Sequence, residues 1–174
     1  MTPNADTSGA TRRGGHPVSG MGYEHLAATA DLIAALEDRG AAYLVDVREN
    51  PATLRAPFTG AAIAEACTAA GIEYRHEPAL GNPPWNRAGF AASGSDRDQA
   101  HAAYRHRLAG KPACAALNRI WVAAGSGPVV ILCREESEAC CHRRLVLERL
   151  ESHLAVEFAP AVEREPEVPA LFPN

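Results

Sequence analysis

A short apolar run at residues 129–133 (VVILC) constrains the fold of this chain more than any other feature of the sequence. The run shows no alternation of polar and apolar residues, and Pro128 introduces it. This is the pattern of a strand buried on both faces of a parallel sheet. Parallel strands are joined by crossover segments that usually contain a helix. We therefore expect strands and helices to alternate along the chain.

Local signals support this alternation. Gly40 and Gly71 are placed to end the first two helices, Thr59 to cap the second, and Pro112 to stand at the first position of a later one. Residues 77–95, rich in Pro, Gly and Asn, are expected to form a loop. Strands are predicted at 18–21, 42–47, 72–76, 129–133 and 156–159, and helices at 27–39, 60–70, 96–108, 112–124 and 142–153. The pattern predicts a three-layer α/β fold with a mainly parallel central sheet flanked by helices.

The size and charge of the chain exclude several classes of protein. Its 174 residues are 47% hydrophobic, which suits one α/β domain at 17–160 between a disordered tail at 1–16 and a Pro/Glu-rich tail at 161–174. The net charge of −4 provides no global positive field for nucleic acid or anionic lipid. There is no membrane-length apolar stretch and no hydrophobic signal segment, so we expect a cytoplasmic protein. Five cysteines, an odd number, favour reduced thiols over a disulfide framework.

Several polar residues are predicted at the carboxyl ends of strands, where parallel sheets bind ligands. Asp46, Arg48, His76 and Cys133 stand at such ends and are expected to converge on one crevice. Asp46 is a candidate catalytic carboxylate, or alternatively the structural partner of a nearby arginine. Arg48 and His76 are candidates for binding a ligand, with a structural role as the alternative for His76. Trp85 is placed either to stack on a planar ligand or to cover the edge of the core.

The segment 133–143 (CREESEACCHR) joins the apolar strand to the last predicted helix. Polar residues in such a loop are positioned by the flanking elements and are free to serve a ligand. The start of the helix directs backbone N–H groups and positive potential into the loop, which favours anions and thiolates. A site here requires that the thiols of Cys133 and Cys141 are not sealed in apolar packing and that the His142 ring does not face bulk water.

One interpretation of this segment is an enzyme active site. Cys133 or Cys141 acts as the nucleophile. His142 and Glu135 then transfer protons, and Arg143 holds an anionic group of the ligand.

Two other interpretations stay open. A metal site would draw its ligands from Cys133, Cys140, Cys141 and His142, because thiolate and imidazole suit zinc or iron. The spacing is not a paired CxxC, which counts against this interpretation. In the structural interpretation, Cys133 is a small apolar residue at the end of a strand and Cys141 faces the core from a helix.

Four blocks of the sequence resemble the sequential motifs of domain-of-unknown-function family 488: MGY at 21–23, LVDVRENP at 44–51, GIEYRHEPALG at 71–81 and LCREESEACCHR at 132–143. The resemblance implies a compact three-layer α/β fold and supplies no reaction. Glu138 stands where the family often has Pro, and Cys140 adds a thiol beside Cys141 that would allow a metal site or a redox-sensitive pair. A disulfide between these adjacent cysteines is strained and is not expected. The motif positions implied for this chain are Asp46, Arg48, Cys133, Glu135, Cys141, His142 and Arg143.

A weaker resemblance is to the rhodanese-like sulfurtransferases, which share a strand ending in DVR and an active cysteine after a central strand. Here Glu135, Glu136 and Glu138 follow Cys133. Three carboxylates oppose ionisation of a nearby thiol and repel a persulfide or a phosphate. Sulfurtransferase or phosphatase activity is therefore not inferred.

Taken together, the sequence predicts a small cytoplasmic enzyme, a cysteine-dependent transferase or hydrolase, that acts on a compact anionic or nucleotide-like small molecule. One alternative is a metal- or redox-responsive binding module without turnover, with zinc or iron as its cofactor. Another is a nucleic-acid-associated accessory protein, against which the acidic balance counts. No membrane partner is expected.

Overall fold

The computed structural model describes residues 15–157, of which 153–157 are described by their backbone alone. Strands and helices alternate along this range, as expected. Their bounds are β1 Val18–Gly22, α1 Thr29–Glu37, β2 Tyr43–Asp46, α2 Gly60–Ala69, β3 Glu73–His76, α3 Pro84–Ala91, α4 Ser95–Leu108, α5 Lys111–Ala124, β4 Val129–Cys133 and α6 Arg143–Glu157. Short 3-10 helices cover Ala56–Phe58, Pro78–Leu80 and Glu138–Cys140.

The strands of the described range form one parallel sheet in the order β1-β4-β2-β3. Gly22 pairs with Cys133, and Asp46 pairs with both Leu132 and His76, so the carboxyl ends of the strands lie level at one edge. The central position and complete burial of β4 confirm the interpretation of the VVILC run.

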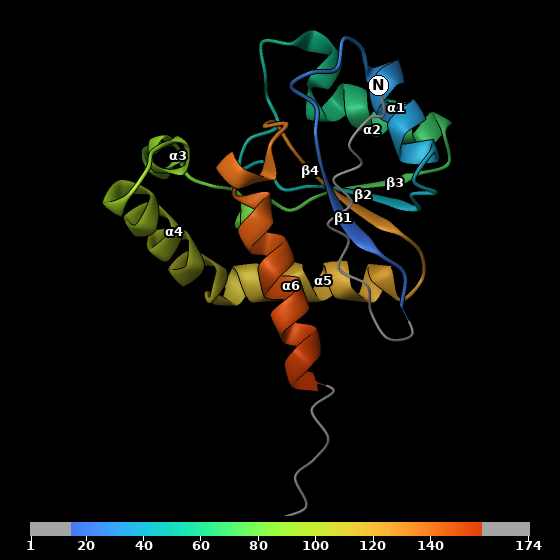
Figure 1. The fold of residues 1–174 in the computed structure, drawn as a ribbon. Helices are drawn as coiled ribbons and strands as arrows, with labels where there is room; N and C mark the ends of the chain where they lie inside the picture. The colour runs from blue at the N-terminus through green and yellow to red at the C-terminus, as the bar shows by residue number, and fades with distance from the viewer. Residues whose placement is uncertain (1–14, 158–174) are drawn as a thin grey trace, which may run out of the picture.

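Helices cover both faces of the sheet and give the fold three layers (Figure 1). On one face, Leu32 of α1 and Ile63 of α2 share a buried apolar cluster with Leu132 of β4. On the other face, helices α4, α5 and α6 share a second cluster with Ile131 and Cys133. Because Cys133 belongs to this second cluster, its side chain projects from β4 toward the layer that contains α6. Each fully buried aliphatic side chain in the two clusters stabilises the fold by about 1.5–3 kcal/mol.

The local signals for helix ends are confirmed. The Thr59 hydroxyl accepts a hydrogen bond from the Ala62 N–H at 3.2 Å and caps α2. Gly40 and Gly71 follow α1 and α2 at φ 61° and 72°, in the left-handed region that glycine adopts without strain. The fourth expected helix begins at Lys111, so Pro112 is its second residue rather than its first. No intrahelical bond is lost there, because the N–H groups of the first turn have no partner in the helix.

The prediction of a loop over residues 77–95 is wrong, because the segment contains α3 and a 3-10 helix. Pro84 stands in the first turn of α3, where proline is tolerated. The helix depends on tertiary contacts: the buried Asn86 amide donates to the Ala100 carbonyl at 3.1 Å, and Phe90 is buried. A Cβ atom at Gly89 would overlap the side chain of Ala100, so glycine allows α3 to approach α4 closely.

The predicted strand at 156–159 is also wrong where it is described, because 156 and 157 belong to α6. Residues 158 and 159 lie outside the described residues, as do both expected tails except for 15 and 16. The last helix begins at Arg143, one residue later than predicted. A short apolar run at the end of an amphipathic segment fits either period, and here the helix includes its first two residues.

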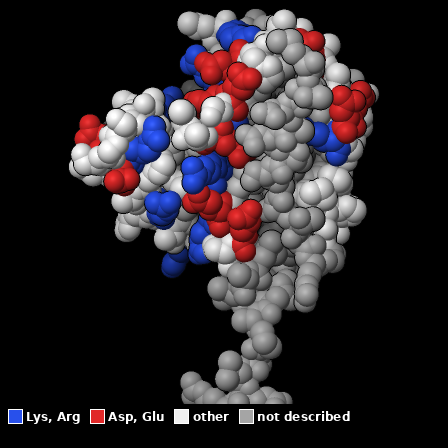
Figure 2. Space-filling model, viewed as in Figure 1, with Lys and Arg blue, Asp and Glu red and all other residues white. Residues whose placement is uncertain are grey.

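Acidic and basic side chains are interspersed on the face shown in Figure 2, and neither sign forms a continuous field there. Within residues 15–157, the helices lack the combination of length and apolar character needed to cross a bilayer.

Candidate functional site

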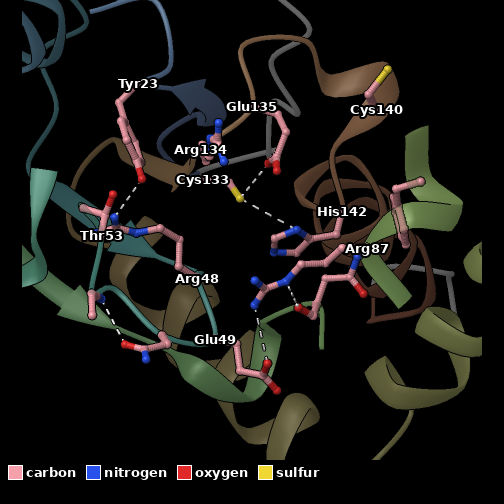
Figure 3. A pocket seen from close by; sticks show the side chains of 14 residues that line it. Tyr23, Arg48, Glu49, Thr53, Arg87, Cys133, Arg134, Glu135, Cys140 and His142 are labelled. Carbon is pink, nitrogen blue, oxygen red and sulfur yellow. Dashed lines mark hydrogen bonds and ion pairs between the residues drawn. The ribbon is translucent and has the colours of Figure 1, made fainter. Parts of the chain in front are cut away.

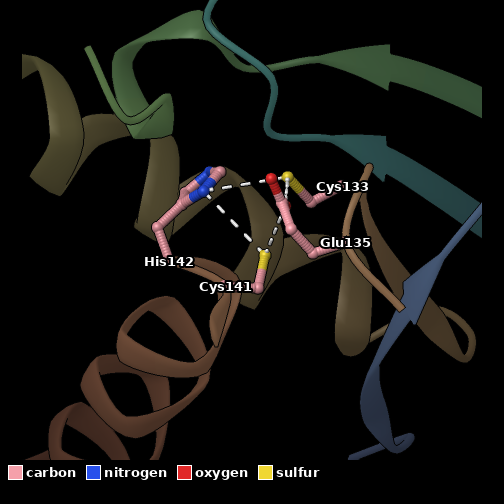
Figure 4. A group of neighbouring side chains, drawn as sticks. All are labelled: Cys133, Glu135, Cys141 and His142. Atoms are coloured by element: carbon pink, nitrogen blue, oxygen red, sulfur yellow. Dashed lines mark hydrogen bonds between the residues drawn. The ribbon is translucent and has the colours of Figure 1, made fainter. Parts of the chain in front are cut away.

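Four side chains with metal-binding or nucleophilic atoms meet at the carboxyl end of β4 (Figure 4). Cys133 ends β4, Glu135 lies in the following loop, and Cys141 and His142 directly precede α6. Their thiol sulfurs, carboxylate oxygen and ring nitrogen all lie within 4.8 Å of one another. Glu135 Oε2 accepts hydrogen bonds from Cys133 at 3.0 Å and from Cys141 at 3.1 Å. We refer to these four residues as the Cys/Glu/His cluster.

The imidazole of His142 presents a defined atom to the two thiols. Its Nε2 lies 3.1 Å from the carbonyl oxygen of Val47. Since a carbonyl only accepts, Nε2 carries a proton, and Nδ1 is the ring atom that faces the sulfurs. Nδ1 lies 3.7 Å from Cys133 Sγ and 3.9 Å from Cys141 Sγ. The ring packs edge-on against Tyr104, with centroids 5.4 Å apart, which helps to fix its orientation.

Burial alone does not make the cluster apolar. Cys133, Cys141 and His142 are each no more than 6% exposed, but their polar atoms face one another and Glu135. Cys133 and Cys141 also belong to the apolar cluster on the α4–α6 side of the sheet, so each sulfur has apolar packing around it as well as Glu135 beside it, and the buried imidazole does not face bulk water.

The two thiols and the Glu135 carboxyl affect one another's ionisation, because a negative charge on one of them disfavours a negative charge on the others. The neighbouring Cys141 thiol, and then burial, raise the pKa of the Cys133 thiol well above its usual value. Burial opposes ionisation of Glu135, but hydrogen bonds from Cys133, its own backbone and Cys141 outweigh it and lower its pKa. Burial likewise lowers the pKa of His142, while Cys133 and the Val47 carbonyl raise it more. The free cluster therefore holds a proton on Cys133, which weakens this thiol as a nucleophile.

Arg143 holds the β4–α6 loop in place. It is 1% exposed, and its Nη1 and Nη2 donate to the carbonyls of Glu135 at 2.6 Å and Glu136 at 2.7 Å. Its backbone N–H and Nη1 each lie 3.5 Å from Cys141 Sγ. A Cβ atom at Gly22 would overlap the Glu135 carbonyl, so glycine at the end of β1 lets the loop lie against the sheet. The arginine expected to hold a ligand anion is thus occupied by the protein itself.

Asp46 and Arg48 form a closed buried pair. Arg48 Nε lies 2.8 Å from Asp46 Oδ1, and the Tyr74 hydroxyl donates to Asp46 Oδ2 at 2.8 Å. The other side of the guanidinium donates to Tyr23 Oη at 3.1 Å and to the Phe58 carbonyl at 2.8 Å. These contacts match the alternative interpretation of Asp46, in which it is the structural partner of a nearby arginine. We refer to Asp46, Arg48, Tyr23 and Tyr74 as the ion-pair network.

The remaining candidates lie apart from the cluster. His76 Nε2 bonds the Arg48 carbonyl at 2.8 Å, and the side chain borders a separate, shallow depression beside α2. Trp85 is 75% exposed and does not line the pocket described below. Cys140 is exposed on the 3-10 helix and does not belong to the group of converging ligand atoms, although it lines the pocket.

A pocket of about 220 Å³ opens over the cluster (Figure 3). Cys133, Glu135 and His142 line it, whereas Cys141 does not. The walls come from segments that follow all the strands of the sheet. They consist of Tyr23, Arg48, Glu49, Asn50, Ala52, Thr53, Asn82, Arg87, Phe90, Arg134 and Cys140.

Sequence reasoning missed several of these lining residues. Tyr23, Glu49 and Asn82 follow the ends of β1, β2 and β3, so the rule that ligands collect at strand ends was a signal for them. Arg87 and Phe90 lie on α3, in a segment whose sequence predicts a loop.

The donor set of the cluster fits a transition metal. Zinc is held tetrahedrally by cysteine sulfur, histidine nitrogen and carboxylate oxygen at about 2.0–2.3 Å, which separates the ligand atoms by roughly 3.3–3.8 Å. The distances of 3.7 and 3.9 Å from His142 Nδ1 to the two sulfurs are close to this spacing. The Val47 carbonyl at Nε2 is the outer partner that a metal-binding histidine usually has. Iron(II) accepts the same ligand types.

Comparison with known proteins adds a family match. The model of a family described as domain of unknown function DUF488 matches residues 28–150, a span that includes the whole cluster. No curated protein and no solved structure matched the chain, so the rhodanese resemblance gains no support.

Proposed function

The chain belongs to the DUF488 family, whose description names no activity, and from the geometry of its site we propose that the Cys/Glu/His cluster is the metal centre of an enzyme. The metal is zinc or iron(II), held by Cys133, Cys141 and His142. Glu135 is either the fourth ligand or the group that moves a proton beside the ion.

The observation that carries this proposal is the convergence of two thiol sulfurs, a carboxylate oxygen and an imidazole nitrogen within 4.8 Å. Without a cation, the cluster keeps a proton on Cys133, because the neighbouring Cys141 thiol and burial raise the pKa of that group. A divalent cation would replace that proton and convert the repulsion between thiolates into attraction. The Arg143 N–H groups, each 3.5 Å from Cys141 Sγ, would support a thiolate at that position.

The pocket favours an enzyme over a purely structural metal site. Structural zinc sites are closed by four protein ligands, whereas catalytic sites keep a position open to substrate. Here Cys133, Glu135 and His142 border the pocket, so a compact molecule entering it would reach the ion directly. Bound metal would supply Lewis acidity, and Glu135 would accept or donate a proton at its pocket-facing carboxylate.

A second candidate is the cysteine-dependent transferase or hydrolase that the sequence predicted. It is favoured by one observation: Cys133 lines the pocket with His142 Nδ1 at 3.7 Å, within reach of a base that could activate it. The raised pKa of Cys133 counts against this candidate, since only the thiolate attacks.

The test is metal analysis of protein purified without chelators and reconstituted with zinc or iron(II) under reducing conditions. We expect one metal ion per chain in the unmodified protein and loss of that ion in Cys133→Ser and Cys141→Ser. Cys140→Ser is the matched control, because this thiol is adjacent in sequence but exposed. Cys67→Ser controls for a buried thiol outside the cluster.

Two results would overturn the metal centre in favour of the thiol enzyme. One is failure to retain either metal through gel filtration. The other is rapid alkylation of Cys133 by iodoacetamide at neutral pH that added zinc does not slow. Slow alkylation made slower still by zinc is the result expected for a metal-binding thiol.

A further inference from the structure

The Arg87 guanidinium contributes a positive charge to the pocket, and its contacts within the protein do not occupy all of its donors. Arg87 extends from α3 toward Glu49 within the pocket (Figure 3). Its Nε donates to the Asn82 carbonyl at 2.9 Å, and its Nη2 lies 3.6 Å from Glu49 Oε2. The same Glu49 carboxylate also faces Arg107 at 3.5 Å. Two guanidinium groups thus share one carboxylate, which leaves a surplus positive charge at the wall of the pocket.

The other arginines of the site have less to offer a ligand. Arg48 is 7% exposed and donates to the ion-pair network and the Phe58 carbonyl. Arg143 is 1% exposed; its terminal nitrogens donate to loop carbonyls, and its Nε, which has no hydrogen-bond partner among the described residues, is buried away from the pocket lining. Arg134 lines the pocket but pairs with Glu24 at 3.2 Å on the surface. The side chain of Arg87 is 54% exposed, and its contact with Glu49 is long, so its guanidinium is available for a further partner.

The size and lining of the pocket define what that partner would be. A volume of about 220 Å³ corresponds to roughly seven water molecules and is below the range of about 300–1,000 Å³ that holds drug-sized ligands. The side chains of Asn50, Thr53 and Asn82 add neutral polar groups to the wall. This combination suits a molecule of a few carbons with one anionic group.

We propose that Arg87 binds the anionic group of a compact substrate, a carboxylate or a phosphate, whose remainder then lies over the Cys/Glu/His cluster. Guanidinium binds either group with two parallel hydrogen bonds, which would orient the substrate as well as attract it. This inference rests on the proposed metal centre, because it places the reacting part of the substrate beside the ion.

The experiment uses full-length protein loaded with cobalt(II), whose thiolate charge-transfer band reports occupation of the cluster and whose visible bands report small molecules that reach the ion. Inorganic phosphate and acetate are the probes, and acetamide is the uncharged control. We expect saturable spectral changes with phosphate or acetate and none with acetamide. The stronger of the two anions identifies the preferred group.

The variant Arg87→Gln is expected to weaken anion binding at least tenfold, and Arg87→Lys to weaken it less, since lysine keeps the charge but not the paired hydrogen bonds. Arg105→Gln, on the exposed side of α4, is the matched control. Absence of the thiolate band would remove the metal centre and this inference together. An intact band with no response to either anion, or with equal affinity in Arg87→Gln, would overturn the role of Arg87 and leave the metal centre standing.

Discussion

The ion-pair network and the Cys/Glu/His cluster lie at the same edge of the sheet, and both consist of buried polar side chains. In the network, the Asp46 carboxylate faces a guanidinium, a tyrosine hydroxyl and the backbone N–H of Arg48. In the cluster, two thiols and a carboxylate lie beside Nδ1 of one imidazole. In the network, the Asp46 carboxylate has a positively charged partner within the protein. In the cluster, three acidic groups share a single imidazole.

This difference separates structural from functional polar groups better than burial or position does. Asp46 and Cys133 are both buried at strand ends, where functional residues are expected. The charge balance around each one distinguishes them, and so does the pocket, which Cys133 lines and Asp46 does not. A buried acid that has its counter-charge within the protein needs no further partner, whereas a buried group of acids without one is suited to bind a cation.

The largest effect that would sharpen this comparison is the removal of the counter-charge from the network. Arg48→Met keeps most of the side-chain volume but leaves the Asp46 carboxylate buried without a guanidinium, so the free energy of unfolding should fall by about 3–5 kcal/mol. Denaturant unfolding at neutral pH measures it. Metal content per folded molecule should stay unchanged, because the network supplies no ligand to the proposed centre.

The matched control is Arg75→Met. Arg75 pairs with Glu73 at 2.8 Å on the surface, with side chains 32% and 55% exposed, and such pairs contribute less than about 1 kcal/mol. Equal losses in the two variants would mean that the network is not the stabilising element described above.

A second comparison tests whether Arg143 positions the proposed metal ligands without being a ligand itself. Arg143→Met removes the donors to the Glu135 and Glu136 carbonyls and to Cys141 Sγ, so the ligands lose their fixed positions. Zinc affinity should fall by about 10- to 100-fold, the usual effect of losing an outer partner of a metal site. Competition with a chromophoric chelator measures this change.

Arg144→Met controls for the charge of the neighbouring residue, because Arg144 is exposed and pairs with Glu148 at 2.9 Å. It should leave zinc affinity unaltered. If Arg143→Met folds with native helix content and binds zinc as tightly as the unmodified protein, Arg143 supports the fold alone.

The parts of the fold that depend on local physics could be predicted from the sequence. The buried β4, the Thr59 cap and the glycines after α1 and α2 each follow from a few adjacent residues. Helix α3 could not be predicted in this way, because its Pro- and Gly-rich sequence favours a turn and its stability comes from contacts with α4. The same loss of information hid Arg87, which only the helix brings into the pocket.

The site was predictable to the extent that it is contained in one segment. Residues 133–143 predicted a site because thiols, carboxylates and an imidazole are close together in sequence. The sequence alone did not decide between Cys140 and Cys141, since one residue along the chain separates an exposed thiol from a buried ligand atom. It also did not show that the guanidinium groups of Arg48 and Arg143 donate hydrogen bonds to backbone carbonyls of other segments.

The smallest effect concerns Cys67, a buried thiol surrounded by apolar side chains of α1, α2 and the sheet. Burial raises its pKa from 9.0 to about 11. The folded protein therefore holds this proton more tightly than the unfolded chain, and the stability that results is fully present below about pH 9 and is lost between about pH 9 and 11. One pKa unit corresponds to about 1.4 kcal/mol, so by pH 10 the unmodified protein should lose about 1 kcal/mol more than Cys67→Ala does.

Denaturant unfolding of both proteins at pH 8 and pH 10 measures this difference, with Cys114→Ala as the exposed-thiol control. The cavity left by Cys67→Ala lowers stability equally at both pH values and cancels in the comparison. Parallel curves for the two proteins would mean that the Cys67 thiol is not desolvated in solution. Added zinc should leave the Cys67 effect unchanged, because a single thiol in an apolar setting offers a cation no second ligand, which is the property that distinguishes it from Cys133.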